Sequence, residues 1–472
     1  MRASVPHAAP DRSRSRTLTE RLSSPIDTAL LVYFRILFGA ILLWEVYRHF
    51  RHGWIRAFYV RPTVHFTYYG FDWVRPWPGD GMSAHFAVLG VLAALLLVGL
   101  WYRISAALLF LGFTYVFLLD QAQYLNHWYL VSLMSFLMIF VPAHRALSLD
   151  AWRNPRLHAE TVPVWSLWLL RAQLGIVYFY AGLAKVNADW LRGEPLRGWL
   201  SSQGDLPLLG GFVAEDWLVL LFAYGSLLFD LLVTPLLLWR RTVVPAIGAA
   251  VVFHLLNWRL FGLGIFPWFM IGATLIFLPP EWPRRWLGLR PPQSDLRAPE
   301  PAAQPRVRLA FLGCYLAMQA LVPLRHYLYP GNVSWTEEGH QFAWHMMLRE
   351  KQADAEFWAV DPADGRTWKI ELWRYVTLRQ RQKMSTNPDM ILQLSHVIAE
   401  DLRGASHGRI RVHALVRASL NGRPAQWLVD PRVDLAAERR TLRPALWIVP
   451  LGDSIHLPYP LADARRRPQS FH

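Results

Sequence analysis

The sequence predicts an α-helical polytopic membrane protein that ends in a small C-terminal α+β extramembrane domain. Of its 472 residues, 53% are hydrophobic and only 18% are charged, against about 25% charged in a typical soluble domain. Apolar stretches long enough to cross a bilayer core of about 30 Å recur through the first two thirds of the chain. The last third loses these stretches and alternates apolar and polar residues, as half-buried strands do.

The helical part is expected to hold about nine transmembrane helices within residues 25–328. The apolar stretches lie near residues 29–47, 84–101, 104–120, 127–141, 163–186, 217–239, 243–257, 262–279 and 308–325. Residues 1–24 are polar and arginine-rich and are predicted to form a disordered cytoplasmic tail. They are not read as a cleaved signal peptide, because the apolar run after them contains Arg35 and Glu45 and has no small-residue cleavage site.

Arginines in the short loops predict the orientation of the helices. They are more abundant in the N-terminal tail and around residues 145–156, 240–241 and 284–308 than in the loops of the opposite side. We therefore expect a cytoplasmic N-terminus and, after an odd number of spans, a C-terminal domain outside. The single cysteine, Cys314, and the short C-terminal part favour the inner membrane of a bacterium.

Residues 329–472 are predicted to form the outward-facing α+β domain. Residues 355–360 and 367–372 alternate on either side of a Pro-Ala-Asp-Gly turn, which indicates a β-hairpin. Residues 387–403 have the pattern of an amphipathic helix. Residues 409–430 are expected to form a second strand pair around the Asn421-Gly422 turn.

Several classes of function are excluded by what the chain lacks. One cysteine rules out a disulfide scaffold and cysteine-ligated zinc or iron–sulfur sites. No Walker A loop, complete G-x-G-x-x-G, H-E-x-x-H or G-x-S-x-G motif is present. The net charge of +15 is spread over loops, so lipid headgroups explain it better than nucleic acid does.

Lysine is scarce in this chain, and one lysine lies in a hydrophobic segment. Of 49 basic residues only four are lysine, and Lys185 is the only one before residue 350. Codon bias toward arginine explains most of this scarcity. Arg171, Tyr178 and Lys185 are spaced by seven residues, which places them along one stripe of a helix. Lys185 can either snorkel to the membrane interface or, desolvated in an apolar site, supply a neutral amine that acts as a base.

Further polar residues lie at helix ends that we expect to face the same outer side. Asn126 and His127 open one helix, and His254 and Asn257 close another. Each of them alone is typical of a helix cap or a satisfied interfacial side chain. Together with Lys185 they predict a cluster of functional groups at one end of the bundle, because polar groups at membrane depth are costly.

Other polar and aromatic residues at membrane depth are given structural interpretations. Arg35 and Glu45 in the first helix and Asp230 in the sixth are interpreted as members of structural pairs. The 24 tryptophans fit an aromatic belt at the membrane interface, and an aromatic-lined cavity would use the same residues.

A series of short motifs then runs in one order along residues 25–450. They are Phe34-Arg-Ile-Leu-Phe-Gly39, Leu100-Trp-Tyr-Arg-Ile-Ser105, Tyr115-Val-Phe-Leu-Leu-Asp120, Asn126-His127, Tyr178-Phe-Tyr-Ala-Gly-Leu-Ala-Lys-Val-Asn-Ala-Asp-Trp190, Phe253-His-Leu-Leu-Asn257, Pro280-Glu-Trp-Pro-Arg284, Trp335-Thr-Glu337, Trp344-His-Met-Met347 and Asp430-Pro-Arg-Val-Asp434. In this order the sequence resembles the vitamin K-dependent gamma-glutamyl carboxylases and their bacterial homologues, the horizontally transferred transmembrane (HTTM) proteins.

The resemblance implies an enzyme, a carbon–carbon lyase that couples gamma-carboxylation of glutamate to epoxidation of a quinol by O2. In this family a lysine deprotonates reduced vitamin K, the oxygenated quinone removes a proton from the glutamate γ-carbon, and the carbanion adds CO2. The matching motifs imply that Lys185 is the base and that Asn126 and His127 are catalytic. Predicted substrate contacts in the same motifs are His254, Asn257, Tyr178 and Trp344.

The resemblance also implies the co-substrates and partners. These are reduced vitamin K or a menaquinol-type quinol from the bilayer, O2, CO2, a glutamate-containing peptide or protein and membrane lipids, with no metal and no nucleic acid. Animal members of the family carry a second lysine where this chain has Ala184, and they have a disulfide and a long lumenal extension. These departures leave the acceptor open. The alternatives are a quinol epoxidase or monooxygenase that acts on a different acceptor or none, and a non-catalytic membrane module that binds lipid or a partner.

Overall fold

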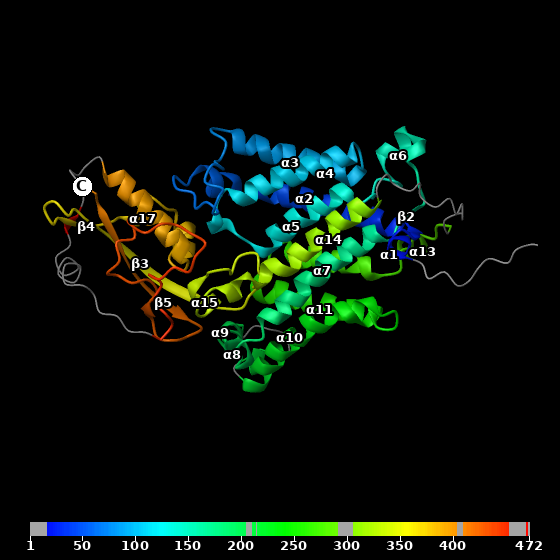
Figure 1. The fold of residues 1–472 in the computed structure, drawn as a ribbon. Coiled ribbons are helices and arrows are strands. Elements are labelled where there is room, and N and C mark those ends of the chain that lie inside the picture. The colour runs from blue at the N-terminus through cyan, green and yellow to red at the C-terminus, as the bar shows by residue number, and fades with distance from the viewer. Residues whose placement is uncertain are drawn as a thin grey trace, which may run out of the picture.

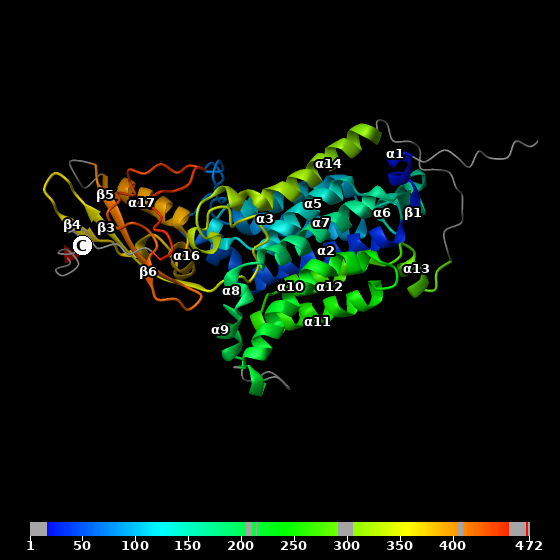
Figure 2. The same cartoon turned by 60° about the horizontal axis from the view of Figure 1, so that its bottom comes forward.

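The computed structural model describes residues 17–203, 210–213, 215–290, 305–403, 409–452 and 469–470. Figures 1 and 2 show two parts: a bundle of long helices and, at one end of the bundle, a small domain built around a β-sheet. We call the end of the bundle that meets this sheet domain the domain end.

Within the described residues, nine helices of the bundle occupy the nine places where the sequence predicts spans. They are α2 (Ala29–Arg51), α3 (Gly81–Val98), α4 (Tyr102–Leu118), α5 (Asn126–Phe140), α7 (Trp165–Ala184), α10 (Asp216–Leu238), α11 (Val243–Phe261), α12 (Phe266–Thr274) and α14 (Pro305–Leu321). In this described part six helices are long and apolar enough to cross a membrane, whereas α4, α5 and α12 with its extension are shorter apolar helices. The protein is thus a multi-pass membrane protein, and nine crossings stay a prediction.

Short elements connect and flank these helices. The helical ones are α1 (Leu18–Leu22), α6 (Leu149–Arg153), α8 (Ala188–Leu191), α9 (Leu196–Ser201), α13 (Trp282–Trp286) and α15 (Val333–Thr336), with a π-helical turn at Arg56–Val60. Turns of 3-10 helix are Gln121–Gln123, Pro155–Leu157, Gly210–Phe212, Leu275–Phe277, Val322–Leu328 and Leu372–Arg374. Strands β1 (Pro25–Asp27) and β2 (Thr161–Pro163) form a separate antiparallel pair.

The predicted disordered tail, residues 1–24, is only partly within the described residues, which begin at residue 17. Residues 18–22 form α1 because Thr17 and Glu20 make a capping box, in which each side chain accepts a hydrogen bond from the other's backbone N–H. Strand β1 follows directly. For residues 17–24 the structure therefore replaces the predicted disorder with a capped helical turn tied to β1, and the prediction for residues 1–16 lies outside the described residues.

Two glycines allow the close helix approaches that shape the bundle. A Cβ atom at Gly39 would lie 2.8 Å from the Leu97 Cα, so α2 and α3 meet there without side-chain spacers. At Gly182 a Cβ would lie 2.8 Å from the Leu231 side chain, which brings α7 against α10. Small residues at helix contacts are a common device in membranes, because backbones can then pack closely.

Arg35 closes the opposite end of the bundle from within. Its side chain is fully buried, and its guanidinium donates hydrogen bonds to the carbonyl oxygens of Ala143 (2.8 Å) and Leu147 (2.5 Å), with further bonds to Leu97 and Ala146. A guanidinium offers five N–H donors, so it can satisfy several free carbonyls beyond helix ends at once. Arg35 therefore has a structural role, as predicted, but its partners are backbone carbonyl oxygens and not a carboxylate.

The C-terminal domain is a mixed, mostly antiparallel sheet covered by a helix. The strand order is β6-β5-β3-β4-β7, and β7 (Gln469–Ser470) pairs parallel to β4. Strand β3 (Lys351–Val360) pairs with β4 (Thr367–Lys369) as the predicted hairpin. Strand β5 (Arg411–Leu420) pairs with β3 along its whole length and with β6 (Gln426–Trp427). The hairpin and the second strand pair are confirmed.

The predicted amphipathic helix is also confirmed, as α17 (Pro388–Leu402), preceded by α16 (Leu378–Met384). Its apolar residues Ile391, Leu394 and Ile398 are buried in one core with Val412 and Val416 of β5. Figure 1 shows α17 lying along the sheet. At the tip of the β5–β6 pair, Asn421 (φ 51°) and Gly422 (φ 74°) are both left-handed, which an Asn-Gly turn accommodates.

The sheet domain is attached to the bundle by one buried and one half-buried set of polar contacts. Gln380 of α16 donates to the Asp120 carboxylate after α4 (2.8 Å). At the start of α8, Asp189 accepts hydrogen bonds from Arg423 and Asn421 of the β5–β6 turn (both 2.8 Å). Burial raises the pKa of Asp120 to about 7, against the lowering effect of its hydrogen bonds. These contacts attach the sheet domain to the domain end of the bundle at two separate places.

Candidate active site

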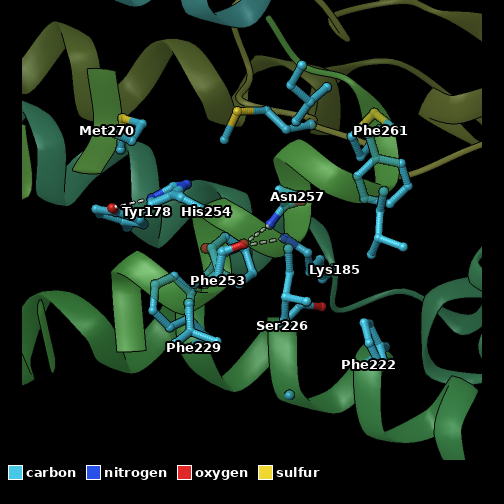
Figure 3. Close-up of a pocket in the computed structure, with 18 of the residues that line it drawn as sticks. Tyr178, Lys185, Phe222, Ser226, Phe229, Phe253, His254, Asn257, Phe261 and Met270 are labelled. Atoms are coloured by element: carbon cyan, nitrogen blue, oxygen red, sulfur yellow. Dashed lines mark hydrogen bonds and ion pairs between the residues drawn. The ribbon is translucent and has the colours of Figure 1, made fainter. Parts of the chain in front are cut away.

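A cavity of about 600 Å³ lies between α7, α10, α11 and α12 at the domain end. Its walls are mostly apolar, with the aromatic rings of Phe222, Phe229, Phe253, Phe261 and Phe266 among them. Figure 3 shows that few polar groups enter this cavity, and that Lys185 is one of them. An apolar cavity of this size with a few polar groups is typical of a site for a small apolar ligand.

Lys185 lies at the C-terminal end of α7, where the helix stops before Asn187 caps α8. Its side chain is only 7% exposed, so it does not snorkel to the surface. The Nζ atom donates to the Asp230 carboxylate and to the Ala181 carbonyl (3.3 Å), and it lies 5.4 Å from the Trp190 ring centroid. The lysine is therefore held in the cavity wall by a buried ion pair.

Asp230 lines the same cavity, where the sequence analysis does not place it. The sequence predicts a structural pair for Asp230, and in the structure its partner is Lys185, 45 residues earlier in the chain. The signal was present, because Asp230 is the only charged residue in the apolar stretch 217–239. Nothing in a single sequence shows which basic residue faces it.

Tyr178 and His254 form a second polar group in the cavity. The Tyr178 hydroxyl is hydrogen-bonded to His254 Nε2 (2.9 Å) and to the Thr274 hydroxyl (3.1 Å). Thr274 in turn donates to the Met270 carbonyl oxygen (2.7 Å), which leaves its oxygen free to accept from Tyr178. If Tyr178 donates to Thr274, His254 Nε2 is the donor to Tyr178. The network fixes the imidazole of α11 against α7.

Asn257 lies one turn after His254 on the cavity side of α11. Its amide nitrogen donates to the Phe253 carbonyl oxygen (2.9 Å), and Figure 3 places its side chain beside Lys185. Four of the seven predicted site residues therefore line one cavity: Tyr178, Lys185, His254 and Asn257.

The other three predicted residues lie at the domain end but do not line this cavity. The His127 ring stacks on Phe266 at 5.7 Å, and Phe266 in turn meets the His254 ring edge-on at 6.2 Å. Phe266 therefore separates the two histidines. Asn126 donates to the His345 carbonyl oxygen (3.0 Å) and accepts from the Tyr124 hydroxyl (2.9 Å), so it ties α5 to the segment after α15.

Trp344 differs most from its predicted role. Its indole is buried and stacks on Tyr129 at 4.8 Å, away from the cavity. The backbone is left-handed at both Trp344 and Met347, and this turn sends Met346 and Met347 into the cavity wall instead. The predicted motif therefore reaches the site through its two methionines.

His345, whose carbonyl oxygen accepts the hydrogen bond from Asn126, belongs to a group of three neighbouring histidines. The His345 ring lies 4.8 Å from that of His326 and 5.0 Å from that of His340. Burial lowers the pKa of His345 to about 3 and holds the pKa of His340 well below its usual range, with nearby arginines adding to both shifts. Both imidazoles are therefore neutral at physiological pH. In the described part of the chain no group of three or more His, Cys, Asp or Glu side chains is arranged to hold a metal ion.

Fold and cavity together define a class, a multi-pass membrane protein with a lysine–aspartate pair in the wall of an apolar cavity. Comparison with protein families narrows this class. The HTTM domain matches residues 23–282, more than half of the chain, and the vitamin K-dependent gamma-carboxylase lumenal domain matches residues 304–454. The chain belongs to the vitamin K-dependent gamma-carboxylase family. The two matches indicate an enzyme of the carboxylase type, and no solved structure matches the chain.

Proposed function

We propose that this protein is a vitamin K-type quinol-dependent carboxylase that modifies glutamate and epoxidises the quinol with O2. The observation that carries this proposal is the buried Lys185–Asp230 pair in the wall of an apolar cavity of about 600 Å³. Membership of the carboxylase family supports the reaction class. The co-substrates are then reduced vitamin K or a menaquinol-type quinol, O2 and CO2.

The cavity at Lys185 fits the head of such a quinol, and we call it the quinol cavity. Its aromatic walls suit a fused ring, and the polar groups of Lys185, His254 and Asn257 can meet hydroxyl or carbonyl oxygens on that ring. Leu221 and Val252 line the cavity and are more than half exposed on the bundle surface, so an apolar tail can leave toward lipid. When bound, the quinol supplies the hydroxyl that is deprotonated and the ring that reacts with O2.

Lys185 is the residue that takes the quinol proton in this proposal. In an apolar site the ion pair can convert to a neutral amine and a neutral carboxylic acid by moving one proton from Nζ to the Asp230 carboxylate, because desolvation penalises separated charges. The neutral amine then accepts the hydroxyl proton. An arginine at this position would keep its proton and could not serve.

His254, Tyr178 and Asn257 are assigned to binding and orientation. His254, held by Tyr178, can donate or accept at an oxygen of the ring, and Asn257 can donate to a developing oxyanion. Asn126 and His127 are assigned to the acceptor side, because Phe266 separates His127 from the quinol cavity.

The proposed location is the inner membrane of a bacterium, with the N-terminus in the cytoplasm and the sheet domain outside. The excess of arginine in the predicted cytoplasmic loops supports this orientation. A glutamate-containing peptide or protein would then be carboxylated outside the cell.

Reconstitution in lipid nanodiscs tests the proposal. The protein is given reduced vitamin K or menaquinol, labelled CO2 and a glutamyl peptide, and both the labelled peptide and the quinone epoxide are measured. Formation of the epoxide without labelled peptide would support the epoxidase alternative. Formation of neither product would support a non-catalytic membrane module. Lys185→Arg is expected to abolish epoxide formation, whereas Lys369→Arg in the sheet domain keeps it. Near-normal epoxidation by Lys185→Arg contradicts the assigned base.

A further inference from the structure

A second cavity, of about 370 Å³, lies at the junction between the bundle and the sheet domain. It is enclosed by the end of α2, the π-helical turn and the residues just before it, the first turn of α5 with the residues before it, the turn before α12, and α16. Its lining residues are Glu45, Arg48, His49, Trp54, Phe58, Tyr59, Gln123, Leu125, His127, Trp128, Gly262, Leu263, Gly264 and Arg379. We call it the junction cavity.

The junction cavity and the quinol cavity are neighbours. Leu263 lines both of them. His127 lines the junction cavity and stacks on Phe266, and Phe266 lines the quinol cavity. A ligand in the junction cavity therefore lies across one aromatic ring from the site proposed for the quinol.

The lining of the junction cavity is basic, in contrast to that of the quinol cavity. It contains the guanidinium groups of Arg48 and Arg379, whereas its one acidic lining residue among those described is Glu45. Among the described lining residues of the quinol cavity, the one cation, Lys185, is balanced by Asp230. In the junction cavity two guanidinium groups face the single carboxylate of Glu45, so one positive charge remains to attract an anionic group.

Arg48 is held in place but keeps donors available. Within the described chain its guanidinium donates one side-chain hydrogen bond, to Glu45 (2.8 Å), out of its five N–H groups. The group lies 4.9 Å from the Trp54 ring centroid. A Cβ atom at position 264 would lie 3.2 Å from the Arg48 Nη atoms, so Gly264 makes room for this plane. Arg48 is 20% exposed at its side chain, which leaves it accessible from water.

Arg379 approaches the same cavity from the sheet domain. It belongs to α16, donates to the Gln123 side-chain oxygen (2.8 Å) and lies 4.8 Å from the Phe58 ring centroid. Burial lowers the pKa of Arg379, with Asp120 acting against this shift, and the guanidinium stays charged. The junction cavity is therefore completed only when the sheet domain is docked on the bundle.

We propose that the junction cavity binds the side-chain carboxylate of the glutamyl acceptor, with Arg48 and Arg379 as its binding residues. A carboxylate that leaves water needs charge-assisted hydrogen bonds, and arginine supplies two parallel ones. This inference rests on the proposed carboxylation and names where its acceptor binds.

Direct binding tests the inference without turnover. The protein in phosphatidylcholine nanodiscs is titrated with a glutamyl peptide and with the matched glutaminyl peptide, and isothermal titration calorimetry measures the affinity for each. Arg48→Gln is expected to weaken glutamyl-peptide binding roughly tenfold or more, as the loss of a hydrogen bond between charged groups does. Arg48→Lys should recover part of the affinity, and the glutaminyl peptide should bind weakly to all variants.

Matched variants keep the test independent of folding. Arg51→Gln removes the same charge from the same helix end outside the cavity and should leave binding unchanged. Arg379→Gln removes the second guanidinium group of the junction cavity and should also weaken binding. Wild-type affinity for the glutamyl peptide in both Arg48→Gln and Arg379→Gln overturns the inference.

Turnover separates the inference from the proposed function. Arg48→Gln should raise the KM for the glutamyl peptide roughly tenfold and leave the KM for the quinol unchanged. If the wild type carboxylates the peptide and Arg48→Gln has the same peptide KM, the inference fails and the function stands. If the wild type makes no epoxide but binds the peptide through Arg48, the proposed function fails and the binding site stands.

Discussion

The Lys185–Asp230 pair makes a quantitative prediction about stability. The two side chains are 7% and 4% exposed, so removing either one leaves the other buried without its charged partner. We expect Lys185→Met and Asp230→Leu each to lower the free energy of unfolding by about 3–5 kcal/mol, the cost of breaking a buried pair. The double variant replaces both charges by apolar groups in an apolar wall, and it should unfold within about 2 kcal/mol of the wild type.

The two single changes and the double change form a thermodynamic cycle. If they were independent, the double variant would lose about 6–10 kcal/mol, so the expected coupling is at least about 4 kcal/mol. Denaturant unfolding in detergent micelles measures all four proteins. The exposed pair Arg285–Glu281 serves as the control, and its coupling should be below about 1 kcal/mol. A double variant that loses the sum of the two single losses would refute the buried pair.

Two further predictions concern helix packing and acid stability. Gly182→Ala should cost about 1–3 kcal/mol, because its Cβ would meet α10 at 2.8 Å, whereas Gly225→Ala, which faces open space, should be neutral or stabilising by about 0.5–1 kcal/mol; equal unfolding free energies for the two variants would contradict the close approach. Because burial lowers the pKa of His345 to about 3, the unfolded chain takes up its proton first as pH falls through 6.5. Stability is therefore lost on acidification, by about 2 kcal/mol for this group at pH 5. His345→Asn should make the decline in unfolding free energy between pH 7 and 5 shallower, and an unchanged decline argues against a buried neutral imidazole.

Local patterns predicted the elements of this fold well. Long apolar runs located the nine helices, alternation located the β3–β4 hairpin, and the Asn421-Gly422 turn located the β5–β6 pair. These features depend on residues close in the chain, where hydrophobic period and turn chemistry act directly. Lys185 stood out because it is the one lysine among apolar neighbours.

Local sequence patterns do not predict contacts between residues that are far apart in the chain. Asp230 faces Lys185 because Gly182 lets α7 and α10 meet, and a single sequence does not give the rotation of one helix against another. Trp344 was expected in the site because of its motif, but its left-handed backbone turns the indole toward Tyr129. The junction cavity was not predicted, because its walls come from five separate segments of the chain.

The corner between α7 and α8 limits how this protein can be divided. Lys185 lines the apolar cavity of the bundle, and four residues later Asp189 accepts hydrogen bonds from Arg423 and Asn421 at the tip of the sheet domain. The two regions that match separate domain models follow one another in the sequence. In the structure, the hydrogen bonds of Asp189 also connect them directly, four residues after Lys185. A truncated bundle would lose an anchor of that corner, and a chimaera that takes its sheet domain from a relative must transplant the partners of Asp189 with it. The working unit for engineering is the whole chain, not either half.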